Sequence, residues 1–284
     1  MGRNGPLEAD FRISAFTFVY NWRACANRAP HETETDKTVR FLILSDIHGN
    51  WEALQAVLAD CSHEYDQAIC CGDLVGYNPN PSEVVEWVRH NCKSVIRGNH
   101  DKVIAGMEGI QWFNEIAQAS VLWSRLQLSE EQLEWLQGLP IGPQKLEHFS
   151  IFHGAPFDED QYILAPEAAA ACFACLESPL SFFGHTHVQG GFFLRWRNIG
   201  RIPGAAVGQR EVTFEIIPDT TYMVNPGSVG QPRDGDPRAG YAIYDSEVRT
   251  VTMRRTEYPI RLTYQRIKDA GLPDVLGLRL FRGI

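Results

Sequence analysis

Gly184-His185-Thr186-His187 decides the fold of this chain, together with four other short strings. They are Asp46-Ile47-His48-Gly49, Gly72-Asp73, Gly98-Asn99-His100-Asp101 and His153-Gly154. Each string follows a short apolar run, at 41–44, 68–71, 94–96, 150–152 and 180–183. A run of that length that ends in glycine or a polar residue is typical of a buried strand leaving its sheet. Since ligands of open α/β sheets bind at the C-terminal ends of strands, the pattern predicts a site there.

The side chains delivered to this edge offer oxygen and imidazole donors and no thiolate. This donor set suits divalent metals such as Mn, Fe, Zn, Co or Ni. Asp46 and His48 stand two positions apart, so in extended chain they share a face and can reach one ion. The sequence therefore predicts a metal site.

The ordered set of motifs resembles the calcineurin-like metallophosphoesterases over roughly residues 39–282. It is most similar to their small bacterial and archaeal branch, in which Asn-Pro-Gly-Ser follows the last histidines, as Asn225-Pro226-Gly227-Ser228 does here. The resemblance implies a four-layer α/β/β/α sandwich, in which two mixed β-sheets are flanked by helices. The order of elements also fits it, because alternating strands and helices are followed by a run of strands.

We expect one domain over 38–284, after an N-terminal extension over 1–37 that is poorly ordered. Packing of the extension on the domain surface and a targeting role are the alternatives. Strands are expected at 39–45, 67–71, 94–97, 149–152, 180–183, 190–196, 211–217, 221–224, 240–245 and 248–254, with a hairpin or loop at 198–210. Helices are expected at 50–61, 82–91, 102–126, 129–139, 166–177, 260–270 and 273–281.

The composition of the chain argues against some classes of function. The formal charge of −9 argues against stable nucleic-acid binding, which depends on a basic surface. No apolar run approaches 18 residues, so no membrane span is expected. The seven cysteines, an odd number, favour reduced thiols and a cytoplasmic location. A homo-oligomer is compatible with the sequence.

The resemblance implies two divalent ions, with Mn²⁺ the first choice and Fe, Zn, Ni or Co as alternatives. It implies one ion held by Asp46, His48, Asp73 and His187. It implies a second held by Asp73, Asn99, His153 and His185, so that Asp73 bridges the two. The assignment of His185 to one ion and His187 to the other is implied by the family resemblance and not by the spacing of the residues.

In the reaction that the resemblance implies, a metal-bridging hydroxide attacks the phosphorus of a phosphodiester or another small phosphoester. His100 lies beside the ligand Asn99 and is expected to protonate the leaving oxygen, with a pKa near the working pH. Asp101 is expected to orient the loop or His100. These assignments predict a metal-dependent phosphoric ester hydrolase.

The sequence departs from the protein-phosphatase branch of the family. That branch has Asp and Arg where this chain has Gly76 and Tyr77, which weakens the interpretation as a serine/threonine-type phosphatase or another phosphomonoesterase. Arg233 is the candidate for binding phosphate oxygens, with Tyr77 and Asn225 as further substrate contacts. A solvated loop charge at Arg233 and a turn-shaping role for Asn225 are the alternatives. A nuclease and a catalytically silent metal-binding scaffold remain competing functions.

Overall fold

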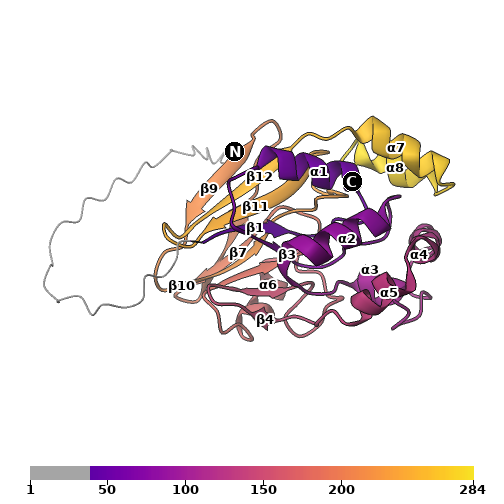
Figure 1. Ribbon diagram of the computed structural model, residues 1–284. Coiled ribbons are helices and arrows are strands. Elements are labelled where there is room, and N and C mark those ends of the chain that lie inside the picture. Colours follow the sequence, from indigo (N-terminus) through magenta and orange to yellow (C-terminus); the bar gives the residue numbers. More distant parts are fainter. Residues whose placement is uncertain (1–38) are drawn as a thin grey trace, which may run out of the picture. The chain divides into compact units, whose positions relative to one another are not determined.

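The computed structural model of the chain describes residues 39–284. The prediction for the extension over 1–37 lies outside these residues. The apolar runs that precede the motif strings form strands in two six-stranded sheets (Figure 1).

The first sheet carries three of the motif strings. Its strand order is β3 (Cys92–Val95), β2 (Gln67–Cys70), β1 (Arg40–Leu44), β11 (Ala239–Asp245), β12 (Thr250–Thr256) and β9 (Glu211–Glu215). The strands β1, β2 and β3 are parallel, whereas β11, β12 and β9 continue the sheet antiparallel. The sheet is therefore mixed, and the loops after β1, β2 and β3 leave from one edge.

The second sheet carries the other two strings. Its strand order is β4 (Gln144–Lys145), β5 (Ser150–Phe152), β6 (Leu180–Phe183), β10 (Thr220–Asn225), β7 (Gly190–Arg195) and β8 (Asn198–Pro203). Here β5, β6 and β10 are parallel, and the outer strands pair antiparallel. This sheet is also mixed, as predicted.

The two sheets pack face to face. Along β1 the side chains alternate, so that Phe41 and Ile43 join the core between the sheets, together with Phe182 of β6. Leu42 and Leu44 point to the opposite face and join the core that includes α1 and α2. The four-layer α/β/β/α prediction is confirmed.

Eight helices complete the described part of the chain. Their bounds are α1 (Trp51–Asp60), α2 (Pro81–Asn91), α3 (Asn99–Ile104), α4 (Glu115–Gln127), α5 (Glu130–Gln137), α6 (Pro166–Phe173), α7 (Ile260–Asp269) and α8 (Asp274–Leu280). Asn50 caps α1, and Ser129 and Gln132 form a capping box at the start of α5. The helices α7 and α8 pack side by side at one end of the sandwich (Figure 1).

The structure corrects one of the expected elements and decides between the two alternatives, hairpin or loop, for another. The helical region expected at 102–126 is two helices, because α3 ends at Ile104 and α4 begins only after the cap Asn114. The intervening loop contains Gly106, whose φ of +79° ends the first helix. The stretch 198–210 contributes a full strand, β8, in a hairpin with β7.

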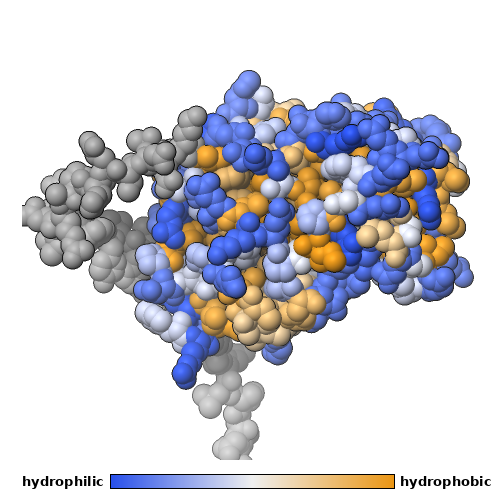
Figure 2. All heavy atoms as spheres, turned by 60° about the horizontal axis from the view of Figure 1, so that its bottom comes forward, coloured by the Kyte–Doolittle hydropathy of each residue, from blue (hydrophilic) through white to orange (hydrophobic). Residues whose placement is uncertain are grey.

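Each helix within residues 39–284 is too short or too polar to span a membrane. On the face drawn in Figure 2, hydrophobic residues are interspersed with polar ones.

Candidate metal centre and active site

Hydrogen bonds of the backbone and of two carboxylates, Asp46 and Asp101, hold the five motif loops together. The amide of Asp46 donates to the carbonyl of Gly72 over 3.0 Å, and the amide of Gly184 donates to the carbonyl of His153 over 2.9 Å. Glycine is required where two loops touch, since a Cβ at Gly98 would lie 2.1 Å from Oδ1 of Asp73. The edge predicted from the sequence is thus a single cradle.

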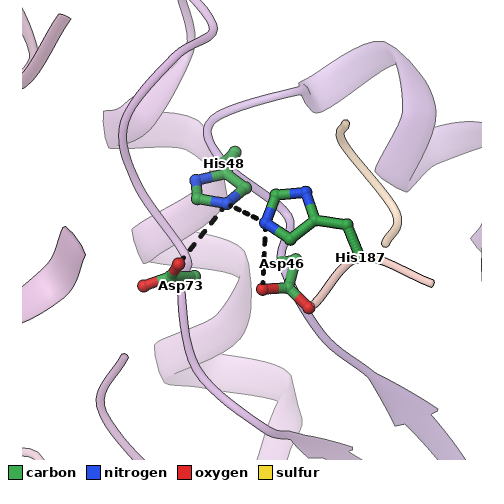
Figure 3. A group of neighbouring side chains, drawn as sticks. All are labelled: Asp46, His48, Asp73 and His187. Atoms are coloured by element: carbon green, nitrogen blue, oxygen red, sulfur yellow. Dashed lines mark hydrogen bonds and ion pairs between the residues drawn. The ribbon is translucent and has the colours of Figure 1, made fainter. Parts of the chain in front are cut away.

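One group of ligand atoms comes from Asp46, His48, Asp73 and His187 (Figure 3). All four side chains are buried, and their ligand atoms lie within 4.8 Å of one another. The Nε2 atoms of His48 and His187 face each other at 3.0 Å. The Nε2 of His48 lies 3.4 Å from Oδ2 of Asp73, and that of His187 lies 3.3 Å from Oδ1 of Asp46. These atoms converge on one point.

A second group contains Asp73, His153 and His185, which are also buried and within 4.8 Å of one another. The Nε2 of His153 lies 3.4 Å from Oδ2 of Asp73 and 3.3 Å from Oδ1 of Asn99. Asn99 therefore adds an amide oxygen to this group. Asp73 belongs to both groups, at the position where a bridging ligand would stand.

Each of the four histidines has its other ring nitrogen on a backbone carbonyl. Nδ1 bonds Val75 O in His48 (3.0 Å), Cys71 O in His153 (2.8 Å) and Gln231 O in His187 (2.6 Å). In His185 the roles are reversed, because Nε2 bonds Asp160 O at 2.9 Å and leaves Nδ1 toward the group. A nitrogen that donates to a carbonyl fixes the tautomer and leaves the other as a lone-pair donor, which is the usual support of a metal ligand.

The backbone of the cradle is strained at its ligands. Positive φ angles of 49–64° occur at five of them, which are Asp46, His48, Asp73, His185 and His187. Left-handed backbone is unfavourable for residues with a Cβ and persists only where surrounding contacts impose it, often at functional sites. The hydrogen bonds between the loops supply those contacts.

The cradle fits divalent cations. Oδ2 of Asp46 is buried without a hydrogen-bond partner, which a cation would satisfy. Burial raises the pKa of Asp46 to about 7 and holds those of His48 and His187 well below the usual value, so both imidazoles are neutral donors. Burial also works to lower the pKa of His153, but Asp73 outweighs it and raises this pKa to about 10. Protons and cations therefore compete for the same atoms.

His100 lies beside the cradle without joining either ligand group. Its Nε2 is 3.0 Å from the hydroxyl of Tyr77, and its ring stacks on Phe113. A pKa near the working pH was expected, but burial lowers the pKa of His100 to about 4. That expectation is wrong for the free protein, because the motif did not reveal how deeply the side chain is buried.

A cavity of about 370 Å³ opens onto the cradle. Its wall includes several ligand side chains together with His100 and Tyr77. Two arginines and three further aromatic residues complete it: Arg233, Arg279, Trp112, Phe113 and Tyr162. Arg233 donates to Oε1 of Gln231 at 3.0 Å, and its guanidinium lies over the ring of Tyr77. The cavity thus joins metal ligands to cationic and aromatic groups.

A family model for the calcineurin-like phosphoesterase superfamily domain matches residues 39–249, well over half of the chain. The chain belongs to this family. The site described above is accordingly that of a phosphoesterase.

Relatives of the phosphoesterase include an archaeal and two bacterial proteins. It is 35% identical over 253 residues to the uncharacterized protein MJ0912 of Methanocaldococcus jannaschii, covering 85% of this chain and 97% of that protein. A solved metallophosphoesterase from Sphaerobacter thermophilus is 36% identical with a TM-score of 0.77, covering 87% of this chain and 100% of that one. A shorter match, over 104 residues, is 33% identical to a symmetrical bis(5'-nucleosyl)-tetraphosphatase of Psychromonas ingrahamii. It covers 35% of this chain and 37% of that protein.

These similarities confirm the family and the bacterial and archaeal branch expected from the motifs. Together with the buried Asp and His groups, they identify the phosphoesterase as a metal-dependent phosphoric ester hydrolase.

Gly76, one of the two positions at which the sequence differs from the protein-phosphatase pattern, lies beside His100. A Cβ at Gly76 would lie 2.6 Å from Nδ1 of His100, and that buried nitrogen has no partner in the described residues. No carboxylate supports His100 from this position.

Asp101 does not contact the imidazole of His100. Its carboxylate accepts hydrogen bonds from the amides of Asp73, Leu74, Val75 and Gly98, at 2.8–3.3 Å. Of the two roles considered from the sequence, the geometry favours the one in which Asp101 orients loops. It holds the backbone of Asp73 and so acts on the cradle indirectly.

The placement of Asn225 differs from the substrate contact expected of it. Its Nδ2 donates to Gly184 O and Thr186 Oγ1, and its Oδ1 accepts from the amide of Gly227. The side chain is buried and does not line the cavity. We therefore correct its assignment to the turn-shaping alternative.

Some residues of the phosphoesterase site carried no signal in the sequence. Arg279 lies in the C-terminal helix α8, far from every motif, and Trp112 and Tyr162 lie in loops. Asp160 contributes a backbone carbonyl to His185, which any residue type could offer. Only the three-dimensional arrangement identifies them.

Proposed function

We propose that the chain hydrolyses small phosphoesters at a dinuclear metal centre. The observation that carries this proposal is the sharing of Asp73 by two buried ligand groups. In the proposed centre, one ion is held by Asp46, His48, Asp73 and His187, and the other by Asp73, Asn99, His153 and His185. Mn²⁺ is the first choice, with Fe, Zn, Ni or Co as alternatives.

Divalent ions bound there would stabilise charge on phosphoryl oxygens and lower the pKa of the attacking water. Arg233 would bind the phosphate from the wall of the cavity, because its buried Nε has no partner in the described residues. His100 would carry the proton to the leaving oxygen. Its low pKa in the free protein means that the negative charge of a bound phosphate must first stabilise the imidazolium.

A nucleotide-like phosphoester is the substrate class best supported. A cavity of about 370 Å³ suits a small ligand rather than a protein segment. The local similarity to a tetraphosphatase that acts on bis(5'-nucleosyl) compounds supports the same class. We place the enzyme in the cytoplasm, since the six cysteines among the described residues are free thiols.

Hydrolysis of bis(4-nitrophenyl) phosphate tests the proposal. The purified chain is stripped of metal, reconstituted separately with Mn²⁺, Zn²⁺, Co²⁺ and Ni²⁺, and assayed with and without chelator. We expect metal-dependent turnover and about two ions per chain by elemental analysis. Binding of metal without turnover of any phosphoester would instead support the scaffold, and a single ion would reject the dinuclear centre.

A further inference from the structure

Two guanidinium groups face the cavity without an aspartate or glutamate partner. Arg233 and Arg279 both line it, and neither forms an ion pair with an acidic side chain among residues 39–284. Several other arginines with mostly buried side chains are paired, as Arg97 is with Glu159 at 3.0 Å and Arg238 with Asp236 at 2.6 Å. Two unpaired cations beside a metal cradle make a wall that favours anions.

Packing of the C-terminal helices fixes Arg279 at this wall. Leu276 and Leu280 of α8 are buried in a cluster that also contains Tyr77 and Ala117 of α4. The Nε of Arg279 donates to the carbonyl of Ile284, which orients the guanidinium. The terminal nitrogens of this guanidinium have no hydrogen-bond partner within residues 39–284 and can bind a ligand.

Arg279 lies outside the machinery that the family model describes. That model matches residues 39–249, whereas α8 spans Asp274–Leu280. The ligand groups and Arg233 all fall inside the match. The second arginine therefore comes from a helix outside the region that the family model matches.

We propose that Arg279 binds a second anionic group of the substrate, beyond the phosphate that reacts at the cradle. This inference rests on the proposed function, in which Arg233 binds the reacting phosphate. It specifies the substrate class as compounds with at least two phosphates in series, such as nucleoside polyphosphates. A guanidinium recognises phosphate through charge-assisted, often bidentate hydrogen bonds.

The aromatic wall of the cavity fits the rest of such a substrate. Tyr162 stacks on the ligand His185 with ring centroids 4.0 Å apart, and its side chain is 47% exposed. Trp112, also 47% exposed, lines the same cavity. Exposed aromatic faces beside an anion site suit stacking of a nucleobase.

Comparison of AMP with ADP tests the role of Arg279, because the two ligands differ by one phosphate. Their affinities for the metal-loaded full chain are measured by titration calorimetry in the parent, Arg279→Gln, Arg279→Lys and Arg282→Gln proteins. Arg282 is the matched control, since it is exposed, three residues away and not part of the cavity wall. We expect ADP to bind the parent more tightly than AMP, and Arg279→Gln to weaken ADP at least roughly tenfold more than AMP.

Arg279→Lys should retain part of the preference for ADP, and Arg282→Gln all of it. An unchanged ratio of ADP to AMP affinity in Arg279→Gln would overturn the inference, and so would an equal loss of both ligands. Calorimetry needs no turnover, so failure of the hydrolase proposal is seen separately, as absence of phosphoester hydrolysis by the parent with every metal. Thermal unfolding of each variant shows whether helix α8 has stayed folded.

Discussion

The metal cradle and the anion-binding wall of the same cavity are built in opposite ways. In the cradle, each ligand histidine is tied to a backbone carbonyl, and Asp101 alone holds four amides. On the wall, Nε of Arg233 and Nδ1 of His100 are buried without partners in the described residues. In the cradle the protein orients the ligands and leaves Oδ2 of Asp46 for a cation, whereas on the wall it leaves nitrogen atoms that could bind a substrate.

The two parts of the cavity should differ in their tolerance of substitution. Ligand geometry must be held by many contacts, because several ligands sit in strained backbone. Residues that meet only the substrate need fewer contacts, and they can change without loss of the cradle. The comparison predicts that substitutions in the cradle remove metal, and that substitutions on the wall leave metal in place.

Asp73→Asn should have the largest effect. Loss of the shared carboxylate charge should deplete both ions and lower kcat by at least about 10³-fold, because the variant removes the metal chemistry as a whole. Elemental analysis and turnover with added Mn²⁺ measure this. The matched control is Asp66→Asn, an exposed aspartate paired with Arg40, which should leave both readouts unchanged. An unaltered metal count in Asp73→Asn would reject the bridging assignment.

His100→Asn should be next in size. We expect kcat to fall by roughly 10²–10⁴-fold for a nucleoside leaving group, which must be protonated, and far less for 4-nitrophenolate, which needs no proton. Metal content should stay at the parent level. The exposed His90→Asn is the control. Metal loss in His100→Asn would show that His100 is a ligand, and an equal fall with both leaving groups would show that it is not the acid.

The pH dependence of metal affinity tests whether protons and cations compete for the ligands of the cradle. The pKa of His153 is raised to about 10 and that of Asp46 to about 7, and each must lose its proton to bind a cation. Affinity should therefore rise with pH, about tenfold per unit between pH 7 and 9 and more steeply below pH 7, where two protons are displaced. Calorimetry in buffers of different ionisation enthalpy counts the protons released. A pH-independent affinity would contradict this coupling.

Motif spacing predicted the cradle well because strand ends and ligand types are local properties of the sequence. Each motif string follows its own strand, and parallel pairing of β1, β2 and β3 brings three of them together. The wall was harder to predict because its members come from unrelated segments. Arg279 reaches the cavity only through the packing of α8, and Asn225 was misassigned because its bonds to Gly184 and Gly227 depend on a neighbouring loop.

Tyr77→Phe should have the smallest effect and tests the wall most directly. The hydroxyl lies 3.0 Å from Nε2 of His100 and accepts from Arg233 at 3.4 Å, so its removal costs one neutral and one weak charged hydrogen bond. A good bond of this kind contributes about 0.5–1.5 kcal/mol and the long 3.4 Å bond adds little, which predicts a fall in kcat/KM of roughly three- to tenfold with metal content unchanged. A loss approaching that of His100→Asn would mean that the phenol itself delivers the proton. In that case the wall would hold a catalytic residue that the motifs do not mark, and the division between a fixed cradle and a tolerant wall would no longer stand.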